Sequence, residues 1–584
     1  MFFAVTAVGK WKANPMKKHE FVPLLAGTIA LLSAISEAGH AQETPALVVE
    51  GGTLIDGLGG APLEDSIIVI ENGRFSAIGA RGAVAIPAGA EIYDATGKTI
   101  MPGFIDGHCH WEHFWPEVYL HLGITSCLST QTRQNGPWVL AQKRAIELGK
   151  IRGPRIWATG TALGEDPEIE FDIKNSRVFR SYLDVPDTAT ARAIVRQKKA
   201  DGYEAIKLTE FLEPELIRAV SDEAHLLGMG VIAHSWDVFE SAPAGLDGIE
   251  HIWSVGYSSI LDLERRNHLA VERTEGRLEA EVMAAQYETE NYDLVINALV
   301  ENNVAWTPTI AKFVRPFSSY ADRFWEREQD IINNPDANLP VIVKVITEYT
   351  TTKLLEEYSD EDREAARLGF EKSLEFIRRF VEAGGILKEG SDSSRGMAAL
   401  LMHEGLAMDV EAGVPPMVAI QAATINPARV FKKDADYGSV EIGKVADLSI
   451  VEGNPLEDIW MTQNVKMVVK DGALVDPAFT GQVNPIPELN SWETMPERIV
   501  VLPEALKQGD GPTELTVLGE GIWPHHQVYI DGRPLETRYI STEELRAVLP
   551  AEMVSDVGMY KVTVRSVGEP NPESNPAPLV VGFR

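Results

Sequence analysis

Four histidines and one aspartate follow short apolar stretches, at points where strands are predicted to end. His108 and His110 are two positions apart, so in a strand both imidazoles face the same side. His234 follows GVIA, His251 follows GIE, and Asp392 follows GILKEGS. Imidazole and carboxylate groups are usual ligands of zinc. Most isolated His-x-His pairs are structural, but five such residues at strand ends predict a metal site.

Lys207 ends another predicted strand, in the sequence AIKL (205–208). One interpretation is a lysine whose stem packs on apolar neighbours while its amine reaches water. The other is an amine that faces the metal site, where burial disfavours the ammonium form. A neutral amine can capture carbon dioxide as a carbamate, whose two oxygens can bridge two divalent ions. Lys207 alone leaves both interpretations open.

The strands that carry these residues alternate with amphipathic helices between residues 103 and 424. The predicted strands are 103–108, 124–129, 155–159, 204–208, 230–234, 248–252, 304–308 and 385–392. Helical patterns lie between them at 137–149, 188–200, 214–228 and 288–302. This alternation predicts a (β/α)8 barrel, whose catalytic groups lie at the carboxyl ends of its strands. The aromatic and charged segment 313–383 predicts a helical, lid-like insertion.

Two further β-rich regions are predicted outside the barrel. Residues 42–102 and 425–484 contain β-branched runs and tight turns, which predict one small β-sandwich built from both flanks. A proline-rich linker, 484–512, runs into strands at sandwich spacing in residues 513–584, and the C-terminal domain is expected over residues 497–584. The expected fold class is therefore α/β, with a barrel, a composite β-sandwich and a C-terminal immunoglobulin-like β-sandwich.

The composition excludes several classes of protein. The 584 residues include 53 Lys+Arg and 86 Asp+Glu, for a formal net charge of −33. Such an acidic surface repels phosphate backbones, so nucleic acid is not an expected partner. Cys109 and Cys127 are the two cysteines of the sequence, which excludes a disulfide framework and an all-cysteine metal cluster.

Residues 1–41 predict a secretory signal peptide. Lys17 and Lys18 precede the apolar run 21–36, and small residues precede a cut after Ala41. A membrane anchor is the alternative, although the run is shorter than the about 20 residues of a membrane span. Met16 is an alternative start to Met1. We expect a mature protein without a membrane span, in the periplasm or secreted.

Taken together, the motifs resemble the amidohydrolase superfamily, and most closely its imidazolonepropionase-like group, which includes metal-dependent prolidases and Xaa-Arg dipeptidases. The resemblance covers about residues 45–480. It rests on TIMPGFIDGHCH (99–110), YEAIKL (203–208), IAHS (232–235), IEHI (249–252), GSDS (390–393) and AATINPARVF…GSVEIGKVADLSIVEGNPLEDI (422–459). The C-terminal region resembles an IPT/TIG domain, through GPTELTVLGEGIWPHHQVYIDGRPL and GMYKVTV.

The resemblance implies a binuclear metal centre and a general base. The implied ligands are His108 and His110 on one ion, His234 and His251 on the second, carboxylated Lys207 as the bridge, and Asp392 on the first ion. Asp392 would also take the proton of the attacking water. The expected ions are two Zn²⁺, with manganese or cobalt as alternatives.

The substrate pocket departs from the family pattern. Many relatives carry Gly-Gly-His after the third strand, where this sequence reads TALGEDPEIEFD (161–172). The usual Thr-Val-Arg-Asp of the second strand is replaced by SCLS (126–129). Tyr257 occupies a stretch where relatives bind a substrate carboxylate, and a residue of the pocket wall is the alternative.

The expected function is hydrolysis of an amide or peptide-like C–N bond in a small substrate, such as a dipeptide or N-acyl amino acid. A mononuclear deaminase or an imidazolonepropionase-type cyclic amide hydrolase is the alternative enzyme, which Lys207 disfavours because such relatives generally lack it. A non-catalytic binding protein is a second alternative, disfavoured by the complete ligand set. The substrate, the native metal and the oligomeric state, including a homo-oligomer, stay open.

Overall fold

The computed structural model describes two long stretches of the chain, 45–481 and 499–582. Gaps in the first are 131–135, 165–181, 186, 210–211, 275–278, 340–342, 344–357 and 394–395. Gaps in the second are 504, 509, 511, 520–521, 523–525, 542, 567–573 and 575–576. The chain divides into two units, Met1–Pro45 and Ala46–Arg584. The predicted signal peptide and residues 484–498 of the predicted linker lie outside the described residues.

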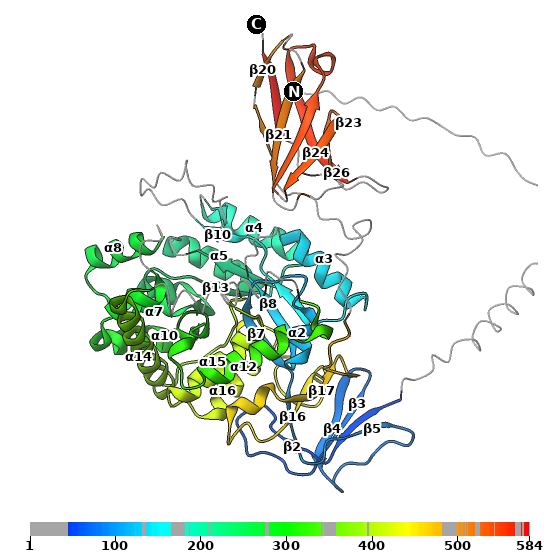
Figure 1. The fold of residues 1–584 in the computed structure, drawn as a ribbon, viewed down its shortest axis with the longest axis vertical. Coiled ribbons are helices and arrows are strands. Elements are labelled where there is room, and N and C mark those ends of the chain that lie inside the picture. The colour runs from blue at the N-terminus through cyan, green and yellow to red at the C-terminus, as the bar shows by residue number, and fades with distance from the viewer. Residues whose placement is uncertain are drawn as a thin grey trace, which may run out of the picture. The chain divides into compact units, whose positions relative to one another are not determined.

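The regions that flank the central part of the chain form two sheets, and the second combines strands from both flanks (Figure 1). The first has the order β4 (Arg74–Ala80), β3 (Ser66–Glu71), β1 (Leu47–Glu50), β5 (Glu91–Asp94). The second has the order β18 (Ala473–Val475), β17 (Val465–Lys470), β16 (Leu448–Glu452), β6 (Lys98–Pro102), β2 (Thr53–Leu54). Ile100 of β6 pairs with Ile450 of β16, so segments from both flanks share one sheet. Ile68 of β3 joins both in one buried apolar cluster.

The central region contains parallel strands in the predicted order. One sheet has β7 (Phe104–Cys109), β8 (Ile124–Ser129) and β9 (Arg155–Ala158). The other contains β12 (Ala205–Leu208), β13 (Gly230–Ala233), β14 (Gly248–Glu250) and β15 (Ala305–Thr307), with β10 (Ala162–Gly164) and β11 (Tyr182–Asp184) at one edge. The two edge strands are absent from the sequence-based expectation. The α/β class is confirmed.

Backbone hydrogen bonds connect these two sheets. The amide of Glu204 donates to Ala158 at the end of β9, over 3.0 Å. Segment 386–392 makes the second connection, although its backbone forms only an isolated bridge to β15. Trp306 of β15 donates to Ile386, and Gly107 of β7 donates to Glu389, each over 2.9 Å. Segment 386–392, where the eighth strand is predicted, therefore lies between β15 and β7, and closure into a (β/α)8 barrel stays a prediction.

Helices lie around these strands in Figure 1. The longer ones are α3 (Gly136–Glu147), α4 (Thr188–Asp201), α5 (Pro214–Leu226), α8 (Leu263–Thr274), α10 (Tyr292–Glu301), α12 (Ala321–Ile332), α14 (Asp360–Glu382) and α15 (Leu400–Glu411). The shorter ones are α2 (Pro116–His121), α6 (Val238–Ser241), α7 (Ile252–Ser259), α9 (Ala280–Met283), α11 (Ala311–Val314), α16 (Pro416–Ala422) and α17 (Ile425–Val430). Among the described helices, none combines the length and the apolar character needed to cross a membrane.

The predicted insertion 313–383 contains a helix that packs on the strands. Ser359 caps α14 by accepting a hydrogen bond from the amide of Asp362, which satisfies one free donor of the first turn. Phe376 and Phe380 then pack on Trp306 of β15, with ring centroids 4.9 and 5.6 Å away. The C-terminal part of this segment therefore covers β15, and a lid role for the rest stays a prediction.

The C-terminal region forms two sheets with an apolar core of their own. The orders are β19 (Ile499–Leu502), β21 (Thr513–Gly519), β25 (Glu544–Leu549), β24 (Glu536–Ser541), and β20 (Ala505–Lys507), β27 (Ala577–Gly582), β26 (Gly558–Ser566), β22 (His526–Ile530), β23 (Arg533–Pro534). Leu515, Val528, Leu545 and Val564 are buried in that core. The alternation of buried and exposed residues suits a β-sandwich, and its assignment as IPT/TIG stays a prediction.

Candidate metal centre

His108, His251 and Asp392 come together in the interior. One donor atom from each lies within 4.8 Å of the donor atoms of the other two. His108 belongs to β7, His251 directly follows β14, and Asp392 ends the segment between β15 and β7. All three are at most 2% exposed. The fold therefore assembles, from distant parts of the sequence, an imidazole and carboxylate set that suits a divalent metal.

The other two predicted histidines contact this group. Nε2 of His110 lies 2.9 Å from Oδ1 of Asp392. Nε2 of His234, which directly follows β13, lies 2.9 Å from Nε2 of His251. His110 therefore lies beside Asp392, and His234 lies beside His251, which is itself 3.6 Å from Asp392. The assignment of these histidines to two separate ions stays a prediction.

His108 is oriented by a buried ion pair that the sequence analysis did not single out. Nδ1 of His108 lies 2.7 Å from Oε2 of Glu250, and Nζ of Lys388 lies 3.0 Å from Oε1 of the same carboxylate. Glu250 and Lys388 are fully buried. Because Nδ1 donates to Glu250, the lone pair of His108 is on Nε2, 3.9 Å from Oδ1 of Asp392. Glu250 and Lys388 could have been found from the sequence, because each is a charged residue within a predicted apolar strand.

A threonine orients His251 in the same manner. Nδ1 of His251 lies 2.7 Å from Oγ1 of Thr309, which itself donates to the carbonyl of Pro308 over 2.8 Å. Nδ1 is therefore the donor, and Nε2 carries the lone pair that faces His234. His251, Thr309 and Asp392 have φ of 71°, 48° and 40°, in the left-handed region. Such backbone conformations cost about 1–3 kcal/mol each and are typical of functional sites.

The electrostatics favour ligand-competent protonation states. Burial lowers the pKa of His108 to about 3, with Glu250 opposing the shift and Lys207 adding to it. Burial and nearby cations also hold the pKa of His251 well below its usual value. Burial by itself would raise the pKa of Asp392, but Lys312 and the histidines bring it well below the ordinary range. Neutral imidazoles and an ionised carboxylate are the forms that bind metals.

Two lysines belong to this region, one predicted from the sequence and one found only in the structure. Lys207 lies in β12, paired with Ile232 of β13, and is 2% exposed. Lys312 of α11 was not predicted, yet its Nζ lies 2.5 Å from Oδ2 of Asp392. No local pattern marks Lys312, because its contact depends on how α11 is placed after β15.

Tyr257 is fully buried inside α7. Its ring packs on Trp236 with centroids 4.7 Å apart. This packing suits the alternative of a wall residue, and contact with a substrate carboxylate stays a prediction for Tyr257. Residues 165–172, where the family pattern changes, lie outside the described residues.

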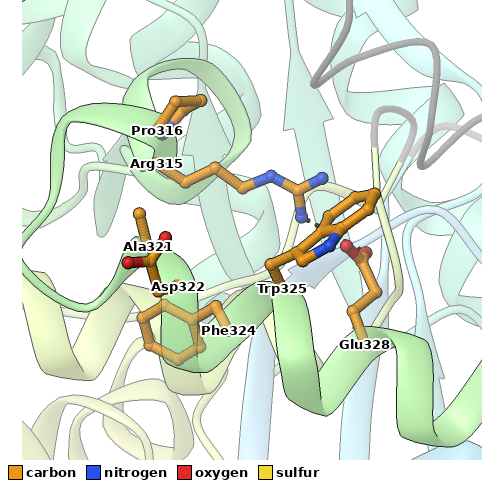
Figure 2. A pocket seen from close by; sticks show the side chains of 7 residues that line it. All are labelled: Arg315, Pro316, Ala321, Asp322, Phe324, Trp325 and Glu328. Atoms are coloured by element: carbon orange, nitrogen blue, oxygen red, sulfur yellow. Dashed lines mark hydrogen bonds and ion pairs between the residues drawn. The ribbon is translucent and has the colours of Figure 1, made fainter.

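A pocket of about 280 Å³ lies beside α12. Its lining consists of Arg315, Pro316, Ala321, Asp322, Phe324, Trp325 and Glu328. Figure 2 shows the guanidinium of Arg315 pointing to Glu328, with a shortest N–O distance of 3.2 Å. None of the predicted metal ligands lines this pocket, so it is not the centre described above.

Comparisons with known proteins bear on the family and on the fold. Residues 350–475 match the amidohydrolase family. The fold resembles a crystal structure of a Xaa-Pro dipeptidase with bound methionine in the active site, with a TM-score of 0.51 and 23% identity over 74% of this chain and 100% of that one. It also resembles a crystal structure of A. niger ochratoxinase, with a TM-score of 0.52 and 19% identity over 74% of this chain and 96% of that one.

The family match, which covers residues 350–475, supports the amidohydrolase superfamily for that part of the chain. An adenine deaminase from Rubrobacter xylanophilus is 22% identical over 442 residues, which are 73% of this chain and 57% of that protein. The chain thus spans less than two thirds of the length of the curated relatives it matches. At these identities the solved structures show the fold alone.

Proposed function

We propose that this protein is a binuclear metal-dependent amidohydrolase that cleaves an amide or peptide-like C–N bond of a small substrate. The observation that carries the proposal is the convergence of donor atoms from His108, His251 and Asp392 within 4.8 Å. His110 and His234 extend this set on either side. We also propose that the parallel strands form a (β/α)8 barrel with this set at its carboxyl end.

We propose that these residues hold two divalent ions. His108 and His110 would bind one, His234 and His251 the other, with Lys207 as a bridging carbamate and Asp392 on the first. The chemistry that bound ions supply is a lower pKa for water and polarisation of the scissile carbonyl. Zinc suits these donors.

The chain supplies proton transfer and orientation. The carboxylate of Asp392, held ionised by its neighbours, accepts the proton of the attacking water and passes it to the leaving nitrogen. Glu250 and Thr309 fix the ring orientation of His108 and His251 through their Nδ1 atoms. Burial of the ligands limits competition from bulk water for the reacting groups.

A deaminase is the second candidate, favoured by the match to adenine deaminase. Both candidates break a C–N bond, so the product separates them. A deaminase releases ammonia from a heterocycle, whereas the proposed enzyme releases an amino acid. The presence of Lys207 favours the binuclear candidate, because the mononuclear relatives generally lack a lysine at this position.

One experiment tests both candidates. The purified protein is analysed for metal content and assayed on dipeptides, N-acyl amino acids and adenine, with amino-acid and ammonia release measured separately. We expect about two equivalents of divalent metal and amino-acid release. Ammonia release from adenine alone would replace the proposal by a deaminase, and no hydrolysis by metal-replete protein would contradict both.

We further propose that the protein is exported, to the periplasm or the medium. The support is the apolar run 21–36 after Lys17 and Lys18. Fractionation of expressing cells, with N-terminal sequencing of the mature chain, tests this proposal. Retention of the full leader on cytoplasmic protein would contradict it.

A further inference from the structure

Three lysines lie beside the proposed metal ligands, and they differ in what holds them. Lys388 is fully buried, and its ammonium contacts Glu250 and the carbonyl of Gly107. Lys207 is 2% exposed within β12. Lys312 reaches the site from α11, and 10% of its side chain is exposed. Of these three lysines, Lys312 is the most exposed.

Lys312 forms an ion pair with Asp392, the carboxylate that the proposed function assigns to a metal ion. Its Nζ lies 2.5 Å from Oδ2 of Asp392, while His110 contacts Oδ1. A metal ion bound to Asp392 would repel the ammonium of Lys312, because both are cations on one carboxylate. Metal binding therefore weakens the ion pair between Lys312 and Asp392. The lysine stem has four flexible carbons and can move its ammonium to another anion. A substrate with its own negative charge supplies that anion.

The surroundings of Lys312 strengthen such an interaction. Its Nζ lies 5.3 Å from the ring of Phe313, and Phe313 packs edge-on against Trp253, with centroids 5.3 Å apart. Trp253 in turn stacks on His251 at 3.9 Å. In so apolar a neighbourhood an ammonium and a carboxylate attract each other more strongly than in water. Tyr257, the sequence-based candidate for this contact, is fully buried.

We propose that Lys312 binds the free carboxylate of the substrate. The site then takes dipeptides or N-acyl amino acids, whose carboxylate is one carbon from the scissile C–N bond, in preference to neutral amides. This inference rests on the proposed function and names its substrate class.

The test compares acid and amide forms of one substrate. The metal-replete wild type and Lys312→Met are assayed on the best dipeptide of the panel and on its C-terminal carboxamide. Loss of a charged hydrogen bond worth about 1.5–3 kcal/mol predicts an about 10–100-fold fall in kcat/KM for the acid, chiefly through KM. We expect an about threefold or smaller change for the carboxamide. Lys312→Arg, which keeps the charge, should retain part of the preference for the acid.

Two controls make the result specific. Lys466→Met removes a lysine from β17 whose side chain is 40% exposed and paired with Glu452, and it should leave the acid preference unchanged. Calorimetry with L-leucine and L-leucinamide measures carboxylate binding without catalysis. The wild type should bind leucine more tightly, and Lys312→Met should lose that difference while keeping its metal content.

The outcomes separate the two proposals. An equal loss of kcat/KM on acid and carboxamide in Lys312→Met would overturn the role in carboxylate binding and leave the hydrolase proposal standing. If the wild type hydrolyses no dipeptide or N-acyl amino acid, the proposed function fails. The binding of leucine and leucinamide, measured by calorimetry, then tests whether Lys312 binds a carboxylate. Equal binding of leucine and leucinamide by the wild type would then overturn the carboxylate subsite too.

Discussion

His108 donates its Nδ1–H to Oε2 of Glu250 over 2.7 Å, although neither side chain is more than 1% exposed. A buried carboxylate is costly unless it is paired, and Lys388 supplies the pairing charge at 3.0 Å. The Lys388 ammonium and His108 overcome burial and lower the pKa of Glu250 below its usual value. The ion pair thus holds one imidazole in the orientation and tautomer that a metal requires.

The first prediction concerns Glu250. In Glu250→Gln the weaker acceptor no longer holds His108, so we expect metal affinity to fall about 10–100-fold. Breaking a buried ion pair costs about 3–5 kcal/mol, so the melting temperature should fall as well. Competition with a chelator measures the affinity, and calorimetry measures stability.

A double variant separates these two effects. Glu250→Gln/Lys388→Met removes both charges and should regain stability without regaining metal affinity. Glu382→Gln, on the exposed side of α14, is the matched control and should change neither quantity. Wild-type metal affinity in Glu250→Gln would show that the carboxylate does not orient His108.

Lys207 is expected to be carboxylated and to bridge two ions. Lys207→Ala should lose most of its metal and activity, and a short carboxylic acid such as propionate should restore part of both. Elemental analysis of protein purified without chelators should approach two equivalents in the wild type. A reproducible value near one with full activity, or wild-type activity in Lys207→Arg, would contradict the bridge.

Asp392→Asn should separate metal binding from proton transfer. The amide keeps the size of the side chain and one oxygen ligand, but it cannot accept the proton of water. Because a positioned carboxylate contributes about 10²–10⁴-fold, kcat should fall by that factor while metal content stays close to two equivalents. Turnover within a few-fold of wild type would place the base elsewhere, with Glu165 and Asp166 the first to test.

The stability of the protein should depend on pH through Glu404. Burial raises the pKa of Glu404 to about 8, with Arg315 opposing the shift and Glu328 adding to it. Between its ordinary value of 4.5 and about 8, the folded state holds a proton that the unfolded chain releases. The free energy of unfolding therefore decreases as pH rises through this window, by up to about 1.4 kcal/mol per pH unit for this group.

Glu404→Gln removes this contribution. Near pH 4.5 the variant and the wild type should have similar free energies of unfolding, and near pH 8 the variant should be the more stable. Urea unfolding at several pH values measures the difference, with Glu382→Gln as the exposed control. The same pH slope in Glu404→Gln and wild type would show that another group holds the proton.

The positions of the strands and of the metal-site candidates could be predicted locally. Short apolar runs between amphipathic helices located β7, β8, β12, β13 and β14 to within two residues at each end. His108 and Asp392 then became candidates through the rule that catalytic groups of a barrel lie at the carboxyl ends of its strands. This succeeded because strand periodicity acts over a few residues, which one segment of sequence records.

The partners of these residues were decided by tertiary structure. Glu250 is 142 positions from His108, and Lys312 is 80 positions from Asp392, so no local pattern connects either pair. Likewise, the sequence leaves open whether Tyr257 lines a pocket or belongs to the core, and in the structure Tyr257 is buried within α7. By itself the sequence determined which groups could bind metal. Only the three-dimensional packing decided which charges face them, because Coulomb interactions and desolvation depend on distances through space and on burial.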